Sequence, residues 1–541
     1  MNVHTLLLVL ITKYTLAAGM GRASRGVVAL AGACLLLLCS GSPAWSRIEL
    51  ARVFDDNMVL QAEMPVRVWG AASPNSSISV TLGDKTLHTS ADREGAWSVG
   101  FPPLAASKAA TTFRVEGDNG AAVQLGNVLV GEVWLAAGQS NMAWPLSQVL
   151  NAQHELRQAA LPALRFYQLT GATHTGRGVY TQEQLAHLDP PNYMRGNWNS
   201  CSPESAGPLS AVAFFFGKQL HRRLDAPVGI VCAAVGGTPT ESWIRRSTLR
   251  QSPELSALTA GNWLENDLLC EWCRQRAKEN LNWGESRRRD LPSDDLGPYH
   301  PFRPGYMWEA GIAQLCGLQF RGVLWYQGES NAESAGLVEQ HRRLFETLVT
   351  DWRSQLQRED LPFLFVQLPA LGRPHWPAFR QSQWECSREI EHTGMVVTID
   401  RGHPTNVHPT DKKPVGVRLA NLALARVYRK EDAQRYLCPT PRAARTEGQK
   451  AWVSFDGVGG GLVSSDGAPL RHFEIAGNDR EYLAASASIV GAGVAVWNDA
   501  VSSPSFVRYA WAPYPTPPLN LYNEAGLPAS PFELPVAHQA D

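Results

Sequence analysis

The sequence lacks an excess of charge of either sign: 49 basic and 50 acidic residues among 541 give a net charge of -1. No basic stripe runs along it, which argues against a nucleic-acid-binding protein, because such proteins neutralise phosphates with lysine and arginine. Internal repeats and low-complexity tracts are also lacking. With 44% hydrophobic and 18% charged residues, the chain has the composition of a folded protein with a large core. Its length predicts two or three domains.

Cysteine is sparse and irregularly spaced. Of nine cysteines, Cys34 and Cys39 lie near the N-terminus, and the remaining seven do not have the spacing of a disulfide scaffold. An odd number leaves at least one thiol free. Cys270-x-x-Cys273 could be redox-active or half of a zinc site, but no second CxxC or HxxxH motif accompanies it. We therefore interpret these two residues as neighbours on a helix and expect no metal.

The N-terminus has the pattern of a signal peptide over residues 1–46. A basic segment begins at Met20, an apolar segment follows from Val27 to Cys39, and small residues surround Ala44. Either translation starts at Met20, or the earlier apolar run from Leu6 to Ile11 belongs to an unusual extended n-region; we favour Met20. The mature protein would begin near Arg47 and be exported, to the periplasm or medium of a bacterium or to the lysosome or exterior of a eukaryotic cell. No amphipathic membrane-docking helix stands out, so we expect no membrane contact in the mature form.

The pattern of the chain changes twice. Residues 47–128 consist of short alternating segments broken by turn residues, as in a small β-sandwich. Residues 129–440 alternate strands with helices, which predicts an α/β domain with a doubly wound parallel sheet. Residues 245–310 within it lack clean periodicity and are interpreted as an insertion with helical pieces. Residues 441–541 return to short strand-like segments and are expected to form a second β-rich region.

The expected sheet places several polar clusters together. Five strands are predicted at 129–137, 226–235, 321–327, 362–368 and 394–400, with helices among them at Ala211–Leu224, Val338–Leu356 and Lys412–Tyr428. Ligands of an open parallel sheet bind beyond the carboxyl ends of its strands. Four of these ends lead into Ser140, Gly236-Gly237, Gln327–Asn331 and His408.

Taken singly, each cluster has an ordinary explanation. A serine after a strand is commonly a helix N-cap, a glycine pair commonly forms a turn, and a lone histidine is commonly a loop residue. Their occurrence together at successive strand ends favours an acyl-transfer site. Ser140 would be the nucleophile and His408 the base that takes its proton. The backbone N–H groups of Ser140 and Gly236, with a side-chain amide from Gln327 or Asn331, would stabilise the oxyanion.

The motifs around these residues are specific. Gly138-Gln139-Ser140-Asn141-Met142, Gly236-Gly237-Thr238, Trp325-Tyr326-Gln327-Gly328-Glu329-Ser330-Asn331 and Val407-His408-Pro409-x-Asp411-Lys412 resemble the sialate O-acetylesterase family of the SGNH (GDSL-like) hydrolases. The resemblance extends from Phe54 to Trp511. It implies a serine esterase with a flavodoxin-like core and β-rich accessory regions. Such an enzyme removes O-acetyl groups from sialic acids or related sugars, without metal or cofactor. It also implies that Ser140 is the nucleophile, His408 the base and Gly236 an oxyanion donor.

Two positions depart from the pattern of this superfamily, in which an aspartate often precedes the catalytic histidine by two or three residues. Those positions hold Asn406 and Thr405 here. The histidine is therefore oriented either by Asp400, from the preceding strand end, or by Asn406 in a Ser-His pair. In the third block, an ionised Glu329 would repel an oxyanion, which favours Gln327 or Asn331 as the donor.

Two further residues are assigned to substrate contact, Gln139 and Glu329, with support of the turn as the alternative for Glu329. The expected substrate is an O-acetylated sialic acid or another acetylated glycan. A rival hypothesis is an esterase for acetylxylan or another polysaccharide on the same core. A third hypothesis is a non-catalytic carbohydrate-binding protein that uses the β-rich regions.

Overall fold

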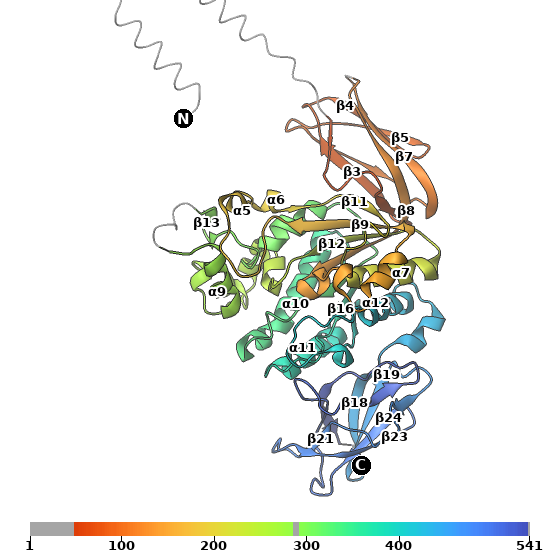
Figure 1. Ribbon diagram of the computed structural model, residues 1–541, viewed down its shortest axis with the longest axis vertical. Coiled ribbons are helices and arrows are strands. Elements are labelled where there is room, and N and C mark those ends of the chain that lie inside the picture. Colours follow the sequence, from red (N-terminus) through yellow and green to blue (C-terminus); the bar gives the residue numbers. More distant parts are fainter. Residues whose placement is uncertain (1–47, 119, 285–290, 539–541) are drawn as a thin grey trace, which may run out of the picture. The chain divides into compact units, whose positions relative to one another are not determined.

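The computed structural model describes residues 48–118, 120–284 and 291–538 (Figure 1). The predicted signal peptide and both candidate start sites lie outside the described residues. Residues 48–541 form one compact unit. Within the described part of the chain, no helix is long and apolar enough to cross a membrane.

A parallel sheet forms the centre of this unit. Its strands run parallel in the order β9 (Leu161–Gly171), β12 (Val228–Ala234), β8 (Ala122–Gly138), β15 (Gly322–Tyr326), β16 (Phe363–Val366) and β17 (Thr393–Val396). Two short strands, β10 (Met194–Arg195) and β11 (Trp198–Cys201), pair antiparallel with β9. The five predicted core strands are present, whereas β9 was not expected.

Helices cover both faces of the sheet (Figure 1). On one face, α7 (Ala211–Leu224) packs against α12 (Lys413–Arg426); elsewhere α10 (Ala335–Gln355) packs against α11 (Trp376–Glu389). Alternate residues of β8 enter two separate hydrophobic cores. Trp134 packs in the core that contains α7 and α12, and Leu135 in the core that contains Trp352 of α10. This alternation is the hallmark of a doubly wound sheet, and the predicted α/β fold class is confirmed.

Local sequence explains where the long helices begin. The Ser210 hydroxyl accepts a hydrogen bond from the backbone N–H of Ala213 at 3.2 Å, and Ser334 caps α10 in the same way through Leu337. Such caps satisfy N–H groups that have no partner inside the helix. Near the catalytic motifs, α3 (Ser140–Ala143) and α4 (Ala152–Arg157) are short, and α5 (Gln182–Ala186) and α6 (Pro190–Tyr193) follow β9.

The N-terminal region is all-β as expected, and it shares a strand with the core. Its strands are β1 (Glu49–Leu50), β2 (Val59–Gln61), β3 (Val66–Ala71), β4 (Ser77–Leu82), β5 (Lys85–Ser90), β6 (Ala96–Phe101) and β7 (Ser107–Gly117). The first half of β8 pairs with β7, its middle pairs with β2, and its second half pairs with core strands. The predicted boundary at residue 128 therefore falls inside a continuous strand.

The segment 245–310 contains short helical pieces, as expected for an insertion. These include α8 (Arg246–Gln251), η3 (Ser256–Thr259), η4 (Trp263–Glu265) and α9 (Glu271–Asn280), with a small hairpin of β13 (Ser293–Asp294) and β14 (Gly297–Pro298). Two further turns of helix, η5 (Trp308–Ile312) and η6 (Ala313–Leu315), lead to β15.

The C-terminal region forms a mostly antiparallel sheet of its own. The order is β22 (Leu483–Ala484), β21 (Phe473–Ala476), β25 (Phe506–Tyr509), β27 (Phe532–Ala537), β18 (Thr440–Glu447), β19 (Lys450–Asp456), β24 (Gly493–Trp497) and β23 (Ser486–Val490). A second small sheet pairs β20 (Leu462–Ser464) with β26 (Leu521–Asn523).

The two residues of the CxxC motif lie at the start of α9, and all seven described cysteines are free thiols.

Candidate active site

Three adjacent strands of the central sheet end at the same level. Ala234 of β12 and Tyr326 of β15 both pair with Gly138, the last residue of β8. Three of the four predicted clusters follow these strands directly, and the loop before α12 supplies the fourth. Loops at the carboxyl edge of a parallel sheet form its ligand site, so the sheet brings residues from three sequence regions together.

Gly138 allows the chain to turn sharply from β8 into α3. Its φ is 135°, and a Cβ atom built on it would lie 2.1 Å from the carbonyl oxygen of Tyr326. No other residue fits this close approach between β8 and β15. The turn leaves Ser140 as the first residue of α3, with its hydroxyl at the edge of the sheet.

Ser140 and His408 are in direct contact. Ser140 Oγ lies 2.7 Å from His408 Nε2, although 268 residues separate them in the sequence. The indole of Trp144 stacks on the imidazole at 5.0 Å between ring centroids. Burial, and after it the positive charge of Lys412, lower the pKa of His408 below its ordinary value. The imidazole is therefore neutral near pH 7 and able to accept the proton of Ser140.

Two backbone N–H groups beside the Ser140 side chain indicate an oxyanion site. A Cβ atom on Gly236 would lie 3.5 Å from Ser140 Cβ, so the two residues are in contact distance. Within the described residues, the N–H groups of Ser140 and Gly236 donate no hydrogen bond. Unpaired, preorganised N–H groups next to a nucleophile are what a developing oxyanion requires.

Neither residue predicted to orient His408 contacts its imidazole among the described residues. Both carboxylate oxygens of Asp400 bind the guanidinium of Arg418 at 2.7 Å, and Arg401 lies 3.0 Å from the same carboxylate. The Asn406 side-chain oxygen instead accepts a hydrogen bond from the backbone N–H of His408 at 2.9 Å. Asp400 is thus paired with arginines, and Asn406 supports the loop that carries His408; a role of either residue in orienting the imidazole stays a prediction.

The predicted amide donors belong to a buried polar network. Gln327 Nε2 donates to Asn331 Oδ1 at 2.7 Å and to the Thr238 carbonyl at 3.3 Å, while Gln327 Oε1 accepts from the Thr240 hydroxyl at 2.7 Å. Asn331 Nδ2 donates to the buried Glu241 carboxyl group at 3.0 Å. Both N–H bonds of Gln327 are therefore occupied, and a role in the oxyanion hole, which stays a prediction, would require it to give one up.

Glu329 and Gln139, which were assigned to substrate contact, bind neighbouring loops. Glu329 is buried and accepts a hydrogen bond from Asn141 Nδ2, and the side-chain oxygen of Gln139 accepts from the backbone N–H of Gly328 at 3.4 Å. Burial raises the pKa of Glu329. For Glu329, these contacts fit the alternative of a residue that supports the turn.

Sequence reasoning missed the part that Asn141 and Lys412 play. The Asn141 amide donates to Glu329 and to the Val407 carbonyl, and its oxygen accepts from Lys412 Nζ. Asn141 thus ties the serine loop to the loop that precedes His408. Burial lowers the pKa of Lys412 to about 7. Asn141 and Lys412 both lie within the sequence motifs that resemble the family, and this was the one feature of the sequence that could have identified them.

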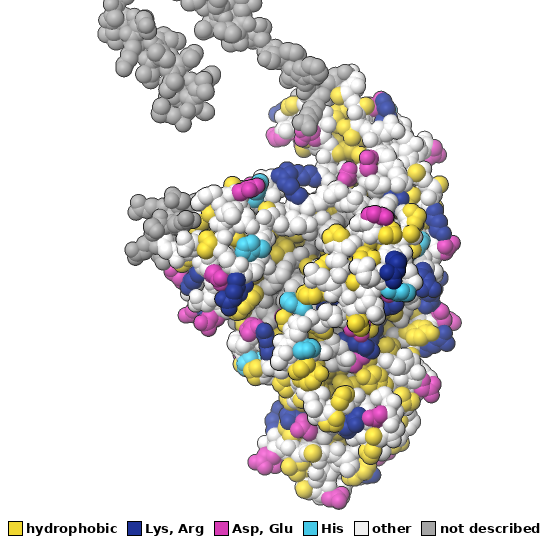
Figure 2. All heavy atoms as spheres, viewed as in Figure 1, with side chains coloured by type: hydrophobic (Ala, Val, Ile, Leu, Met, Phe, Trp, Pro, Cys, Tyr) yellow, Lys and Arg dark blue, Asp and Glu magenta, His cyan; other side chains and the backbone are white. Residues whose placement is uncertain are grey.

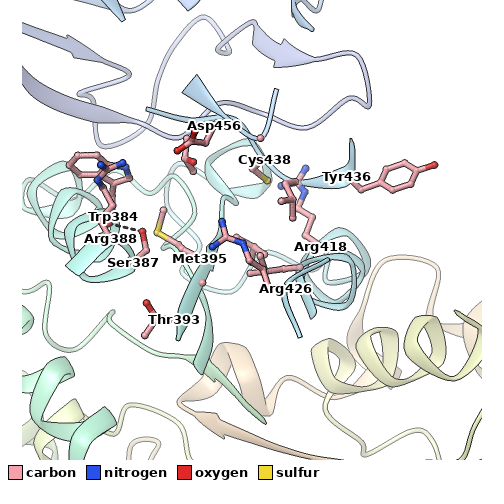
Figure 3. A pocket seen from close by; sticks show the side chains of 16 residues that line it. Trp384, Ser387, Arg388, Thr393, Met395, Arg418, Arg426, Tyr436, Cys438 and Asp456 are labelled. Carbon is pink, nitrogen blue, oxygen red and sulfur yellow. Dashed lines mark hydrogen bonds between the residues drawn. The ribbon is translucent and has the colours of Figure 1, made fainter. Parts of the chain in front are cut away.

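A separate cavity of about 250 Å³ lies between α11, α12, β17 and the start of the C-terminal region (Figure 3). Arg418, Arg426, Cys438 and Asp456 are among the residues that line it, and none of the predicted site residues does. No group of three or more potential metal ligands occurs within the described residues.

Comparison with known proteins decides the family. A family model described as carbohydrate esterase, sialic acid-specific acetylesterase matches residues 307–425, which include the third block and His408. The sialate O-acetylesterase of Mus musculus is 30% identical over 412 residues, or 69% of this chain and 72% of the mouse protein. The chain belongs to the sialic acid-specific acetylesterase family.

Two further similar proteins agree with this assignment. The Homo sapiens sialate O-acetylesterase is 26% identical over 432 residues, 73% of each chain. A solved carbohydrate acetylesterase from Xanthomonas citri superposes with a TM-score of 0.73 at 32% identity, covering 90% of this chain and 99% of that one. The protein is therefore a carboxylic ester hydrolase of the carbohydrate esterases. The resemblance stated from the motifs is confirmed.

Proposed function

We propose that this family member removes O-acetyl groups from sialic acids or related glycans through an acetyl-serine intermediate. The observation that carries the proposal is the 2.7 Å contact between Ser140 Oγ and His408 Nε2, beside the unpaired N–H groups of Ser140 and Gly236. The names of the relatives support an O-acetylated sugar as substrate.

The chemistry follows from this geometry. His408 Nε2 takes the proton of Ser140 Oγ as the oxygen attacks the acetyl carbonyl carbon. The N–H groups of Ser140 and Gly236 stabilise the negative carbonyl oxygen of the tetrahedral intermediate, where loss of one such donor costs about 3 kcal/mol. The intermediate then breaks its bond to the sugar oxygen, which takes the proton from His408. Water, activated by the same histidine, attacks the acetyl-serine and releases acetate.

The test of the mechanism is substitution of the nucleophile. We expect Ser140→Ala to lower the kcat for hydrolysis of a simple aryl acetate by at least about 10³-fold, because the covalent step is lost. Ser147→Ala, an exposed serine seven positions further on, is the matched control and should leave kcat unchanged. A wild-type protein without turnover would instead favour the non-catalytic carbohydrate-binding hypothesis.

The choice of glycan is tested by acetate release from O-acetylated sialic acid and from acetylated xylan. Preference for xylan by orders of magnitude in kcat/KM would replace the sialate substrate by a plant polysaccharide.

Export of the protein is part of the same proposal, since glycans outside the cell can be reached only by an exported enzyme. N-terminal sequencing of protein recovered from the medium or periplasm should find a start near Arg47, and an intact leader on cytoplasmic protein would contradict export.

A further inference from the structure

A groove of about 830 Å³ lies between α9, in the segment predicted to be an insertion, and the start of α10, which follows that segment. We call it the α9–α10 groove. Its volume is within the range of small-molecule sites. Residues that line it from the two sides include Asp267, Leu268, Glu271, Trp272, Glu333 and Gln340.

The groove adjoins the catalytic loops. A Cβ atom on Gly237 would lie 2.8 Å from Trp272 Cη2, so the indole of Trp272 lies against the turn that carries Gly236. The hydroxyl of Ser330, in the loop after β15, donates to the Gly237 carbonyl at 2.9 Å. A ligand in the groove therefore lies next to the turn that supplies the oxyanion donor.

Trp272 offers exposed aromatic surface that neighbouring side chains hold in place. Its side chain is 41% exposed, although its ring packs beside Phe302 at 5.6 Å and beneath the guanidinium of Arg276 at 5.4 Å. Leu268, another groove residue, is 47% exposed. The C–H groups on one face of a sugar ring carry partial positive charge and are attracted to the negative face of an indole.

Polar groups are placed along the same groove. Arg274 lines the groove, but it is only 8% exposed, its Nε atom is buried, and its guanidinium is paired with Asp267 at 2.8 Å. Gln275 and Gln340 line the groove as well and carry amides that can donate to and accept from sugar hydroxyls. An apolar platform flanked by a few donors and acceptors is the usual composition of a small-molecule site.

The charges in the groove argue against an anionic sugar there. Asp267, Glu271 and Glu333 contribute carboxylates, but Arg274 pairs with Asp267 at 2.8 Å and Arg373 pairs with Glu333, which leaves Glu271 without an ion pair among the described residues. A sugar carboxylate would find no unpaired cation in the lining and would be repelled by Glu271. A neutral sugar meets no such repulsion.

We propose that the α9–α10 groove binds a neutral sugar unit of the glycan, next to the acetylated sugar held at Ser140. This assignment rests on the proposed function and makes the substrate an acetylated oligosaccharide rather than a free acetylated sugar. Trp272 supplies the stacking platform, and the amides of Gln275 and Gln340 supply hydrogen bonds.

The first experiment measures binding without turnover. Isothermal titration calorimetry of the Ser140→Ala protein with xylotriose, a neutral oligosaccharide, should give a measurable Kd, while sialic acid should neither bind the groove nor compete with xylotriose. Adding Trp272→Ala should weaken xylotriose binding by about 10-fold or more, and Trp272→Phe should retain most of it. Tyr514→Ala, an aromatic that is 37% exposed in the C-terminal region, is the matched control and should not change Kd.

The second experiment measures the preference for chain length. For the wild type, kcat/KM should be higher for acetylated xylotriose than for acetylated xylose, and Trp272→Ala should lower this ratio by about 10-fold. If neither xylotriose binding nor this ratio depends on Trp272, or if sialic acid displaces xylotriose, the groove assignment is wrong. If xylotriose binds through Trp272 but no acetyl ester is hydrolysed, the groove stands and the proposed function fails.

Discussion

The side chains of Asp400 and Arg418 form an ion pair whose members are 5% and 4% exposed. Removing one partner of such a pair leaves an uncompensated buried charge, which costs about 3–5 kcal/mol. We expect Asp400→Asn to lower the free energy of unfolding by about 3 kcal/mol, measured by urea denaturation. The kcat of Asp400→Asn, measured at a temperature where the variant is folded, should fall much less than the kcat of Ser140→Ala. The reason is that, among the described residues, Asp400 makes no contact with His408 and pairs with Arg418 instead.

The control for this prediction is the exposed pair of Asp432 and Arg223, whose side chains are 59% and 27% exposed. Asp432→Asn should change the midpoint of urea unfolding little, since solvent screens exposed ion pairs. If Asp400→Asn instead leaves stability intact and abolishes turnover, the carboxylate orients the base after all.

Lys412 makes the activity of His408 depend on a neighbouring cation. A nearby positive charge disfavours the imidazolium, so it lowers the pKa of His408, in addition to the larger effect of burial. In Lys412→Met this charge is gone and the pKa of His408 rises. The acid limb of kcat/KM against pH, where the base becomes protonated, should therefore move to higher pH.

Lys413→Met is the matched control for this measurement. Lys413 is adjacent in sequence but pairs with Glu155 on the far side of the helix start, at 2.8 Å. Its substitution should leave the acid limb in place. An acid limb that stays put in Lys412→Met, or moves to lower pH, would contradict the electrostatic account.

For single residues, the sequence predicts which side chains belong to the candidate site better than it predicts which side chains they contact. Ser140 and His408 follow strand ends, and the sheet geometry alone places such residues together. The partner of Asp400 is Arg418, which lies 18 residues later in α12 and binds both oxygens of the carboxylate. Nothing in the local pattern around Asp400 indicates that pairing, which is decided by side-chain packing.

The turn from β8 into α3 depends on Gly138. We expect Gly138→Ala to lower kcat for an aryl acetate by about 10²-fold, because the added Cβ would clash with the Tyr326 carbonyl and displace Ser140 by a fraction of an ångström or more. Gly100→Ala, in β6, is the control, since a Cβ there meets nothing within 4 Å. Retained activity in Gly138→Ala, with a normal unfolding midpoint, would show that the turn tolerates the side chain.

Secondary structure was predictable where apolar residues recur at a regular spacing without interruption. The helix expected at Ala211–Leu224 has the same bounds as α7. Strand β9 was missed because Pro162 stands near its start and Arg165 interrupts its apolar run. Arg165 is nonetheless buried, since its guanidinium binds the side-chain oxygens of Asn57 and Asn127 at 3.2 Å. A buried charge paired with distant residues cannot be recognised from periodicity.

At the scale of the whole chain, composition predicted three regions but not how they are joined. The strand that carries Ser140 begins in the N-terminal sheet, and the Gln61 side chain of that sheet accepts a hydrogen bond from the backbone N–H of Val133 at 2.8 Å. On the C-terminal side, the buried guanidinium of Arg380 donates to the carbonyls of Ala512 and Pro513. The accessory regions are therefore bonded to the elements that hold the catalytic loops. Basic and acidic side chains are interspersed over the visible face (Figure 2).

These shared bonds predict cooperative unfolding. Because β8 belongs to two sheets, the N-terminal region cannot unfold without removing the pairing partners of the strand that positions Ser140. We expect differential scanning calorimetry of the protein to give one endothermic transition, with loss of esterase activity at the same temperature. Gln61→Leu, which removes the side-chain acceptor for Val133, should lower the temperature of that single transition without splitting it. Two separate transitions, with activity surviving the first, would mean that an accessory region unfolds independently of the catalytic core.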